Sequence, residues 1–301
     1  MSDDTGRTAL ITIAHGRHAH WRAQRSALAR SEVQPDEHIL VAMADDELAA
    51  LATERRNPPT VVQVETHDSG LPLAHARNVG AEAALQNGAQ TLIFLDVDCL
   101  PDAGLVGGYE AAAASSALAG RLLSGPVTYL APAPADGYEL DRLSAFDDPH
   151  SARPAPPRGE VVLGGNHDLF WSLSFAVTAA TWRSIGGFHE AYVGYGGEDT
   201  DFAWTARRNG IGLAWIGDAR AYHQHHVVED PPVRHLEDIM RNAVLFRDRW
   251  GVWPMRGWLD AFVTRGLLDR APDGDGYRRR SDAEASHRQV STPPAYTAHS
   301  G

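Results

Sequence analysis

Two aspartates close an apolar run in the first third of the chain. Residues 91–98 read Thr-Leu-Ile-Phe-Leu-Asp-Val-Asp, so Asp96 and Asp98 follow a segment typical of a strand buried on both faces. Because side chains alternate along a strand, both carboxylates are expected to point the same way at the rim of a sheet. Such carboxylates repel each other unless a cation or a donor-rich ligand lies between them. The pair indicates a divalent-metal site for a phosphorylated ligand, and a plain polar turn broken by Pro101 is the alternative.

A second group of acids begins a predicted helix behind a glycine-rich segment. Residues 194–201 read Gly-Tyr-Gly-Gly-Glu-Asp-Thr-Asp. An acid in a first helical turn is usually a capping or dipole device. Three acids in four residues, beside an aromatic side chain, exceed that need. Glu198 and Asp201 lie one helical turn apart, so they share a face and are suited to fix either an acceptor or the loop.

A histidine cluster follows at His223, His225 and His226. Zinc sites use defined spacings and cysteine partners, which this segment lacks. A metal-bound histidine is therefore expected here only if the carboxylate site exists.

The elements that must position these groups alternate between strand and helix. The apolar and helical periods predict four strands in the first hundred residues, at 8–14, 38–43, 60–65 and 91–95. They also predict two helices, one that follows a loop at 15–18 and runs through about residue 30, and one at 74–88. This alternation predicts an α/β protein with a parallel sheet, helices on both faces and ligands beyond the carboxyl ends of the strands.

The remainder of the chain is predicted less regularly. The expected elements are a helix at 104–119, strands near 121–130, 161 and 171–178, a proline-rich loop at 149–159 and a helix from 198 to Asn209-Gly210. Residues 251–270 place Trp253, Trp258, Leu259, Phe262, Val263 and Leu267 near helical spacing. This apolar stripe is expected to pack against the catalytic domain or a second subunit, as in a homodimer, and less readily against a membrane.

Composition narrows the class of protein. The formal net charge of −12 argues against a nucleic-acid partner, because phosphate backbones require a basic surface. The single Cys99 excludes an intrachain disulfide, and no apolar run approaches the length of a membrane span. The acidic amino terminus is unlike a signal peptide, so we expect a cytoplasmic protein, with peripheral membrane contact left open.

The motifs together resemble nucleotide-sugar glycosyltransferases of the GT-A fold, family 2-like at the amino end and galactosyltransferase-like further on. The matching segments cover about residues 8–226 and are Ala76-Arg77-Asn78 with Gly80, Asp96-Val97-Asp98, Gly186-Gly187-Phe188, the segment from Gly194 to Asp199, and His223. His223 follows Glu198 by 25 residues, a spacing similar to that of the polypeptide N-acetylgalactosaminyltransferases. Tyr195 stands where the galactosyltransferases have Trp. The family's acid after the second strand has only a poor match at Met43, Asp45 or Asp46.

The resemblance implies a Rossmann-like, mostly parallel GT-A sheet with an acceptor-side subregion in the second half. We expect one domain over residues 7–270, with a donor half at 7–101, an acceptor and catalytic half at 102–230 and a helical extension at 231–270. Residues 271–301, poor in apolar side chains, are expected to be disordered.

The implied activity is metal-dependent transfer of a sugar from a nucleoside diphosphate sugar, with UDP-sugars favoured, to an acceptor hydroxyl. Asp98 and His223 would bind Mn²⁺ or Mg²⁺, and the imidazole favours Mn²⁺. The resemblance assigns the donor to Ala14, His15, Arg17, Arg77 and Asp96, and the acceptor to Tyr195, Gly197, Glu198 and Asp201. Asp199 would be the general base of an inverting reaction. The alternatives are a retaining transferase, a sugar nucleotidyltransferase, a glycoside hydrolase and a noncatalytic sugar-binding or sugar-nucleotide-binding domain.

Overall fold

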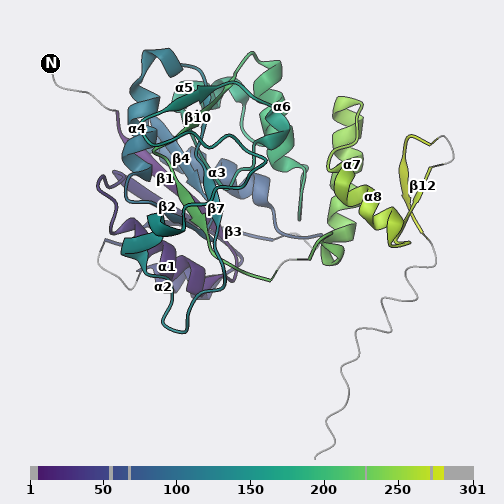
Figure 1. Ribbon diagram of the computed structural model, residues 1–301, viewed down its shortest axis with the longest axis horizontal. Coiled ribbons are helices and arrows are strands. Elements are labelled where there is room, and N and C mark those ends of the chain that lie inside the picture. The colour runs from purple at the N-terminus through teal and green to yellow at the C-terminus, as the bar shows by residue number, and fades with distance from the viewer. Residues whose placement is uncertain (1–5, 54–56, 67–68, 228, 272–273, 281–301) are drawn as a thin grey trace, which may run out of the picture. The chain divides into compact units, whose positions relative to one another are not determined.

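The computed structural model describes residues 6–53, 57–66, 69–227, 229–271 and 274–280 (Figure 1). The chain divides into two compact units, Met1–Val227 and Val228–Gly301.

The first unit is built on an eight-stranded sheet in the order β3-β2-β1-β4-β9-β6-β10-β8. The strands are β1 (Thr8–Ala14), β2 (Glu37–Met43), β3 (Thr60–Val64), β4 (Thr91–Leu95), β6 (Leu122–Ser124), β8 (Val161–Leu163), β9 (Ser174–Thr178) and β10 (Leu213–Ile216). The first four positions, β3-β2-β1-β4, pair in parallel, and β10 pairs in parallel with β6. Only β9 and β8 run against their neighbours. The predicted class, a mostly parallel α/β sheet, is confirmed.

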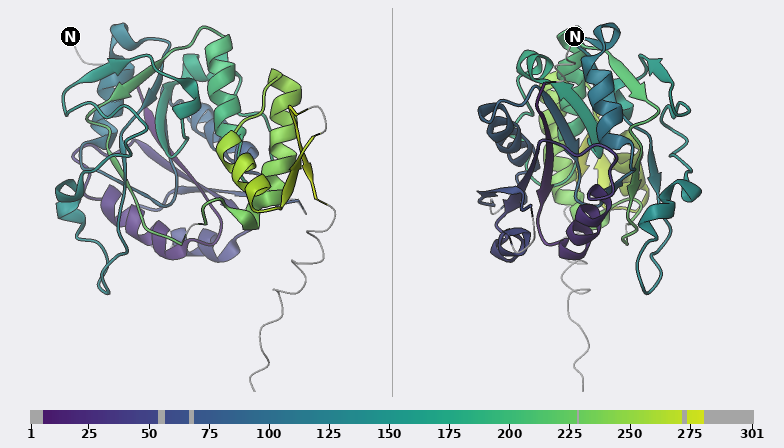
Figure 2. Two further views of the ribbon diagram at one scale, coloured as in Figure 1. Left: turned by 45° about the vertical axis from the view of Figure 1, so that its right-hand side comes forward. Right: turned by 90° about the vertical axis from the view of Figure 1, so that its left-hand side faces the viewer.

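Helices cover both faces of this sheet (Figure 2). They are α1 (His18–Leu28), α2 (Asp46–Thr53), α3 (Leu73–Gln86), α4 (Leu105–Ala114), α5 (Ala179–Ile185) and α6 (Glu198–Arg208), with short 3₁₀ turns η1 (Ser116–Leu118), η2 (Leu140–Phe146) and η3 (His167–Leu169). Ile11 of β1 meets α3 where Gly80 approaches so closely that a Cβ there would lie 2.6 Å from Ile11 Cγ2. The next side chain along the strand, Leu10, packs with α4 residues on the opposite face.

A second, three-stranded sheet forms beside the first from β5 (Cys99–Pro101), β11 (Ala221–His223) and β7 (Val127–Tyr129), in the order β5-β11-β7. The antiparallel register places His223 opposite Cys99. Segments more than a hundred residues apart in sequence therefore meet directly after the turn that carries Asp98.

The second unit contains η4 (Val233–His235), α7 (Leu236–Trp250), α8 (Arg256–Thr264), β12 (Leu268–Arg270) and β13 (Tyr277–Arg279). Three residues of its apolar stripe, Trp253, Leu259 and Phe262, are buried in a cluster of the unit's own side chains, and Trp258, Val263 and Leu267 are partly buried against it. Side chains of α7 and of the β12–β13 hairpin thus cover part of the stripe, and its packing against the catalytic domain or a second subunit stays a prediction.

Several boundaries differ from the sequence prediction. The strand expected at 121–130 is two strands in different sheets, β6 and β7, and the helix expected at 104–119 ends at Ala114. Helices α2 and α5 were not predicted. The disorder expected from residue 271 is wrong for Tyr277–Arg279, which pairs with β12, while residues 281–301 lie outside the described residues. No helix within the described ranges has both the length and the apolar character that crossing a bilayer requires.

Candidate functional site

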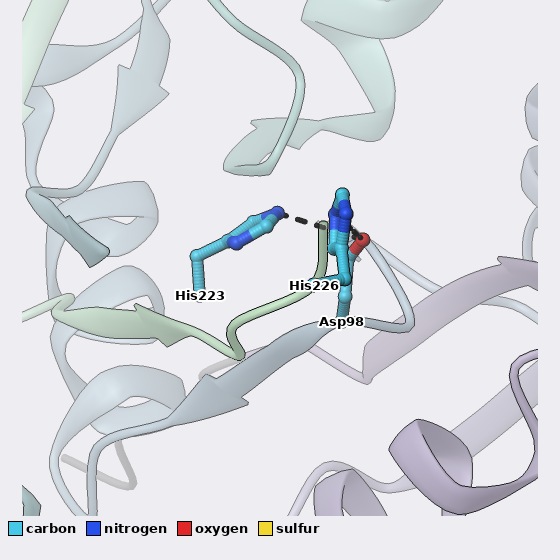
Figure 3. A group of neighbouring side chains, drawn as sticks. All are labelled: Asp98, His223 and His226. Carbon is cyan, nitrogen blue, oxygen red and sulfur yellow. Dashed lines mark ion pairs between the residues drawn. The ribbon is translucent and has the colours of Figure 1, made fainter. Parts of the chain in front are cut away.

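Asp98, His223 and His226 converge at the end of the three-stranded sheet (Figure 3). Nε2 of His223 and Nε2 of His226 each lie 3.5 Å from Oδ2 of Asp98. One ligand atom from each of the three side chains lies within 4.8 Å of the other two. Burial opposes ionisation of Asp98, but its interactions with the two histidines outweigh burial and hold the pKa of the carboxyl well below its usual range. The group presents two imidazole nitrogens and one ionised carboxylate, which is a ligand set for a divalent transition metal.

The two aspartates of the motif lie in a turn, not on the strand itself. β4 ends at Leu95, and the backbone N–H of Cys99 donates to the carbonyl of Asp96 at 2.8 Å. Strand alternation therefore does not aim these carboxylates, which corrects the geometric premise of the sequence prediction. Asp98 faces the histidines and Asp96 faces Arg77, so the segment is both a polar turn and part of a metal-compatible cluster.

Gln24 of α1 fixes this turn and was not anticipated from sequence. Its side chain is fully buried and donates to the carbonyls of Asp96 at 2.8 Å and Cys99 at 2.9 Å. From the other side, the backbone N–H of Gln224 donates to the carbonyl of Asp98 at 2.7 Å. The turn is thus held to α1 and to the segment after β11, which keeps Asp98 facing His223.

Arg77 on α3 is enclosed by carboxylates. Its Nη2 lies 3.1 Å from Asp96 and its Nη1 lies 3.4 Å from Glu198, and the residue is only 4% exposed. Its guanidinium also lies 5.3 Å from the ring centre of Phe188. Burial lowers the pKa of Arg77, but the two carboxylates more than compensate and raise it. The structure therefore brings together Arg77 and Asp96, which were assigned separately to the donor, and both terminal nitrogens of Arg77 are already paired to protein.

The adjacent Asn78 connects two of the motifs. Its side chain accepts from the backbone N–H of Phe188 at 2.8 Å and donates to the carbonyl of the same residue at 2.9 Å. Gly187 is needed here, because a Cβ at that position would lie 2.7 Å from Asn78 Oδ1 and its φ is +79°. Phe188 then stacks on Phe202 of α6, with 4.2 Å between the ring centres. The close approach at Gly187 thus helps to orient the helix that carries Glu198, Asp199 and Asp201.

The start of α6 holds Glu198, Asp199 and Asp201 in different surroundings. Gly197 precedes the helix with a φ of 94°. Burial, with the neighbouring charge of Asp199, raises the pKa of Glu198 to about 7 against the opposing effect of Arg77. Its Oε2 is buried without a hydrogen-bond partner. Burial also raises the pKa of Asp199, whose Oδ1 accepts from the backbone N–H of Thr200 at 2.7 Å.

Asp201 and Tyr195, both expected on the acceptor side, are placed differently. Asp201 is 1% exposed and accepts a hydrogen bond from the hydroxyl of Tyr192 at 3.2 Å, which ties α6 to the preceding loop. Of its two predicted roles, this position favours fixing the loop. Tyr195 is 40% exposed, and burial of its hydroxyl with the nearby charge of Asp199 raises its pKa to about 12.

The loop after β1 is shaped by Asp45. This carboxylate accepts from the backbone N–H of Gly16 at 2.7 Å, from that of Leu48 at 2.8 Å and from His18 at 3.0 Å. Burial acts against ionisation of Asp45, but the hydrogen bonds from Leu48 and Gly16 dominate and lower its pKa. Asp45 therefore shapes the loop that holds His15 and Arg17.

The predicted donor residues of this loop diverge in position. Ala14 is buried, whereas His15 contacts the carbonyl of Met43 at 2.7 Å. Arg17 is exposed with a φ of 33°. The charge of Arg17 helps to lower the pKa of Asp98. It also lowers the pKa of His20 on α1, for which burial is the larger cause. His20, which sequence reasoning missed, lies 6.4 Å from His226 between ring centres and so belongs to the surroundings of the cluster.

Comparison with known proteins agrees with this architecture. Residues 166–227 match the family model described as the N-terminal domain of galactosyltransferase. No curated protein matches the sequence. The matched segment contains α6 and β11, and thus the acids and His223.

Solved structures with the same fold include TarS 1-349 of S. aureus, with a TM-score of 0.51 and 16% identity over 79% of this chain and 65% of that chain. The TarS 1-349 complex with UDP-GlcNAc gives a TM-score of 0.53 at 16% identity over 79% of this chain and 66% of the other. GalNAc-T7 with UDP, GalNAc and Mn²⁺ gives 0.50 at 14% identity over 73% and 43%.

The chain spans less than two thirds of the length of these structures, and at such identities the likeness describes the fold. The chain therefore has the GT-A fold, and its residues 166–227 match the family model of the galactosyltransferase N-terminal domain.

Proposed function

We propose that this protein transfers a sugar from a nucleoside diphosphate sugar, with UDP-sugars favoured, to an acceptor hydroxyl in a reaction that requires a divalent metal. The observation that carries the proposal is the convergence of Asp98, His223 and His226 at a turn that Arg77 connects, through Asp96, to Glu198 at the start of α6. The similar structures solved with UDP-GlcNAc, or with UDP, GalNAc and Mn²⁺, support the class of donor and metal.

The donor atoms of the cluster fit a transition metal better than Mg²⁺. Mg²⁺ prefers carboxylate oxygens and retains water, whereas imidazole suits transition metals. We therefore favour Mn²⁺ and add His226 to the predicted ligands Asp98 and His223, leaving His225 as an exposed neighbour. Bound there, the cation supplies the Lewis-acid charge that a departing diphosphate needs.

The residues of the chain would share the remaining work. In this proposal the loop with His15 and Arg17 borders the nucleotide, as part of a donor half at 7–101. Arg77 holds Asp96 and Glu198 in place. Its effect on the donor is therefore indirect, because it positions the turn that carries Asp96 and Asp98. Residues 102–230 form the acceptor half, where Tyr195, Gly197 and Glu198 border the acceptor.

Asp199 is proposed as the general base of an inverting transfer. The side chain is partly exposed at the start of α6, and burial raises its pKa, which strengthens it as a proton acceptor near neutral pH. In the reaction its carboxylate takes the proton of the acceptor hydroxyl as that oxygen forms the bond to the anomeric carbon and the diphosphate departs. A retaining outcome is the second candidate, favoured by the 25-residue spacing between Glu198 and His223.

The test begins with binding and then follows the product. UDP is titrated into the protein with Mn²⁺, with Mg²⁺ and with EDTA, and binding only with metal is expected. A panel of UDP-sugars is then screened for release of UDP with acceptor sugars, and the anomeric configuration of the product is read by NMR. A noncatalytic binding domain would bind the donor but release no UDP, and a nucleotidyltransferase would turn over only with a nucleoside triphosphate and a sugar phosphate.

A further inference from the structure

Arg153 is a buried cation that forms no ion pair with any residue in the described ranges. It lies in the irregular segment between η2 and β8 and is 6% exposed. Its Nη2 donates to the hydroxyl of Ser124 at 2.8 Å. Its Nε and Nη1 are buried without a hydrogen-bond partner. A buried charge is costly unless it is paired, so two unpartnered donors on one guanidinium require an explanation.

Two tryptophans hold this guanidinium. Its central carbon lies 5.2 Å from the ring centre of Trp171 and 5.1 Å from that of Trp215. Trp215 is fully buried in β10, and its Nε1 donates to the carbonyl of Gly164, so that ring is fixed. Desolvated cation–π contacts stabilise the charge but form no hydrogen bonds to its N–H groups. The arrangement orients a cationic head without supplying a counter-ion.

Arg153 belongs to residues 102–230, the half of the chain that the proposed function assigns to the acceptor. Trp171 contacts His150 at 5.0 Å between ring centres, His150 contacts Tyr129 at 5.7 Å, and Tyr129 packs on the proposed ligand His223 at 4.7 Å. Asp199 and Tyr129 also act electrostatically on Arg153. A line of aromatic side chains therefore leads from the metal cluster to Arg153. Tyr129 and His150 of this line are exposed and Trp171 is half-buried, so part of the line faces solvent.

Arg77 and Arg153 have opposite environments, and this difference defines the inference. Both are buried, but Arg77 is saturated by Asp96 and Glu198, whereas Arg153 has one neutral partner. We propose that Arg153 binds an anionic group, a carboxylate or a phosphate, on the acceptor, so that the enzyme glycosylates an acidic acceptor. Guanidinium binds such groups through charge-assisted hydrogen bonds, which the paired Arg77 cannot offer. This inference rests on the proposed transferase function.

The experiment compares matched probes by thermal shift in the presence of UDP and Mn²⁺. Glucuronic acid and glucose 6-phosphate are each compared with glucose. The acidic probes are expected to raise the melting temperature of the wild type, because they bind only the folded state, and glucose should raise it much less. Arg153→Met should lose the shift and Arg153→Lys should keep part of it. Arg158→Met is the matched control, since Arg158 lies in the same segment but is exposed and paired with Asp102 at 2.8 Å.

The outcomes separate this inference from the proposed function. If UDP and Mn²⁺ do not raise the melting temperature of the wild type, the proposed transferase function is refuted. If they do, but acidic and neutral probes then raise it equally, only the role of Arg153 is refuted. A UDP shift in EDTA that depends on Arg153 would assign the anion to the donor diphosphate and overturn the acceptor assignment. If Arg153→Met melts far below wild type, that variant is set aside. The response of the wild type to acidic and neutral probes, and the response of Arg153→Lys, then decide whether Arg153 binds the anion. With a turned-over acceptor, Arg153→Lys should raise its KM by about tenfold or more and leave the KM of the donor unchanged.

Discussion

Nη2 of Arg77 lies 3.1 Å from a carboxylate oxygen of Asp96, so helix α3 holds the turn that follows β4. The second terminal nitrogen of the same guanidinium reaches Glu198 at the start of α6. One side chain thus connects the proposed metal turn to the proposed catalytic helix. The contact explains why an arginine can be buried here, since both neighbouring charges are opposite in sign.

Removal of Arg77 should therefore destabilise the fold. Arg77→Met leaves the buried Glu198 and the partly buried Asp96 without a counter-charge, and breaking a buried ion pair typically costs about 3–5 kcal/mol. We expect a loss of this size in the free energy of unfolding, measured by urea denaturation. Arg142→Met, which removes an exposed ion pair to Glu139, is the control and should cost about 1 kcal/mol or less. Equal stability of Arg77→Met and wild type would contradict the proposed clamp.

The metal ligands can be tested one at a time. Asp98→Ala should abolish Mn²⁺ binding, measured by calorimetry, because it removes the only anionic ligand of the cluster. His226→Ala should weaken Mn²⁺ binding by about tenfold or more, comparable to the loss of an outer-shell partner at other metal sites. His225→Ala, a change at an exposed neighbour, should leave Mn²⁺ affinity unchanged. If His226→Ala binds Mn²⁺ as tightly as wild type, the ligand set reverts to Asp98 and His223.

Sequence patterns predicted the first half of the sheet because local periodicity determines it. β1, β2, β3 and β4 agree with the expected strands to within one residue at each end, and α3 with the expected helix to within two. These segments are apolar runs bounded by glycine, proline or polar residues, so each carries its own signal. β6 and β7 are separated only by Gly125-Pro126, and the sequence prediction joined them into one strand. Their separation depends on pairing with different sheets, which the local pattern does not show.

The site was predicted in part, and the reason differs between residues. Asp98 and His223 were named from motifs, but the participation of His226 depends on the register of β11 against β5, which no local pattern reveals. Gln24 and His20 lie on an amphipathic helix among other polar residues, so nothing marked them. Arg153 lies in a proline-rich segment predicted as a loop, and its burial depends on Trp171 and Trp215 from other parts of the chain.

The raised pKa of Glu198 predicts how stability changes with pH. Folding raises this pKa from 4.5 to about 7, so the native state holds the proton more tightly than the unfolded chain. The stabilisation that comes from the proton on Glu198 is therefore fully present below the pKa of the unfolded chain, 4.5. It is lost as pH rises from there to about 7, and at higher pH the stability no longer changes through this group. Relative to wild type, Glu198→Gln should gain free energy of unfolding across this interval. Urea unfolding of both proteins at several pH values measures the difference, and a pH-independent difference would refute the shift.

The assignment of Asp199 as general base gives the most specific prediction. Asp199→Asn should lower the rate of transfer by about 10²–10⁴-fold, because the acceptor hydroxyl would lose its proton acceptor in the transition state. Binding of UDP and Mn²⁺ should persist, and the melting temperature should remain near that of wild type, since loss of a helix-start interaction typically costs about 1 kcal/mol.

Asp201→Asn, two residues along the same helix, is the matched control for Asp199→Asn. Asp201 is buried and accepts from Tyr192, so its change should lower stability more than turnover measured on the folded fraction. The two variants thus distinguish a proton acceptor from a structural acid in one helical turn. Near-wild-type turnover by Asp199→Asn would remove it from the reaction. A product that retains the anomeric configuration of the donor would replace inversion with the retaining mechanism, and Asp199 would then position the acceptor.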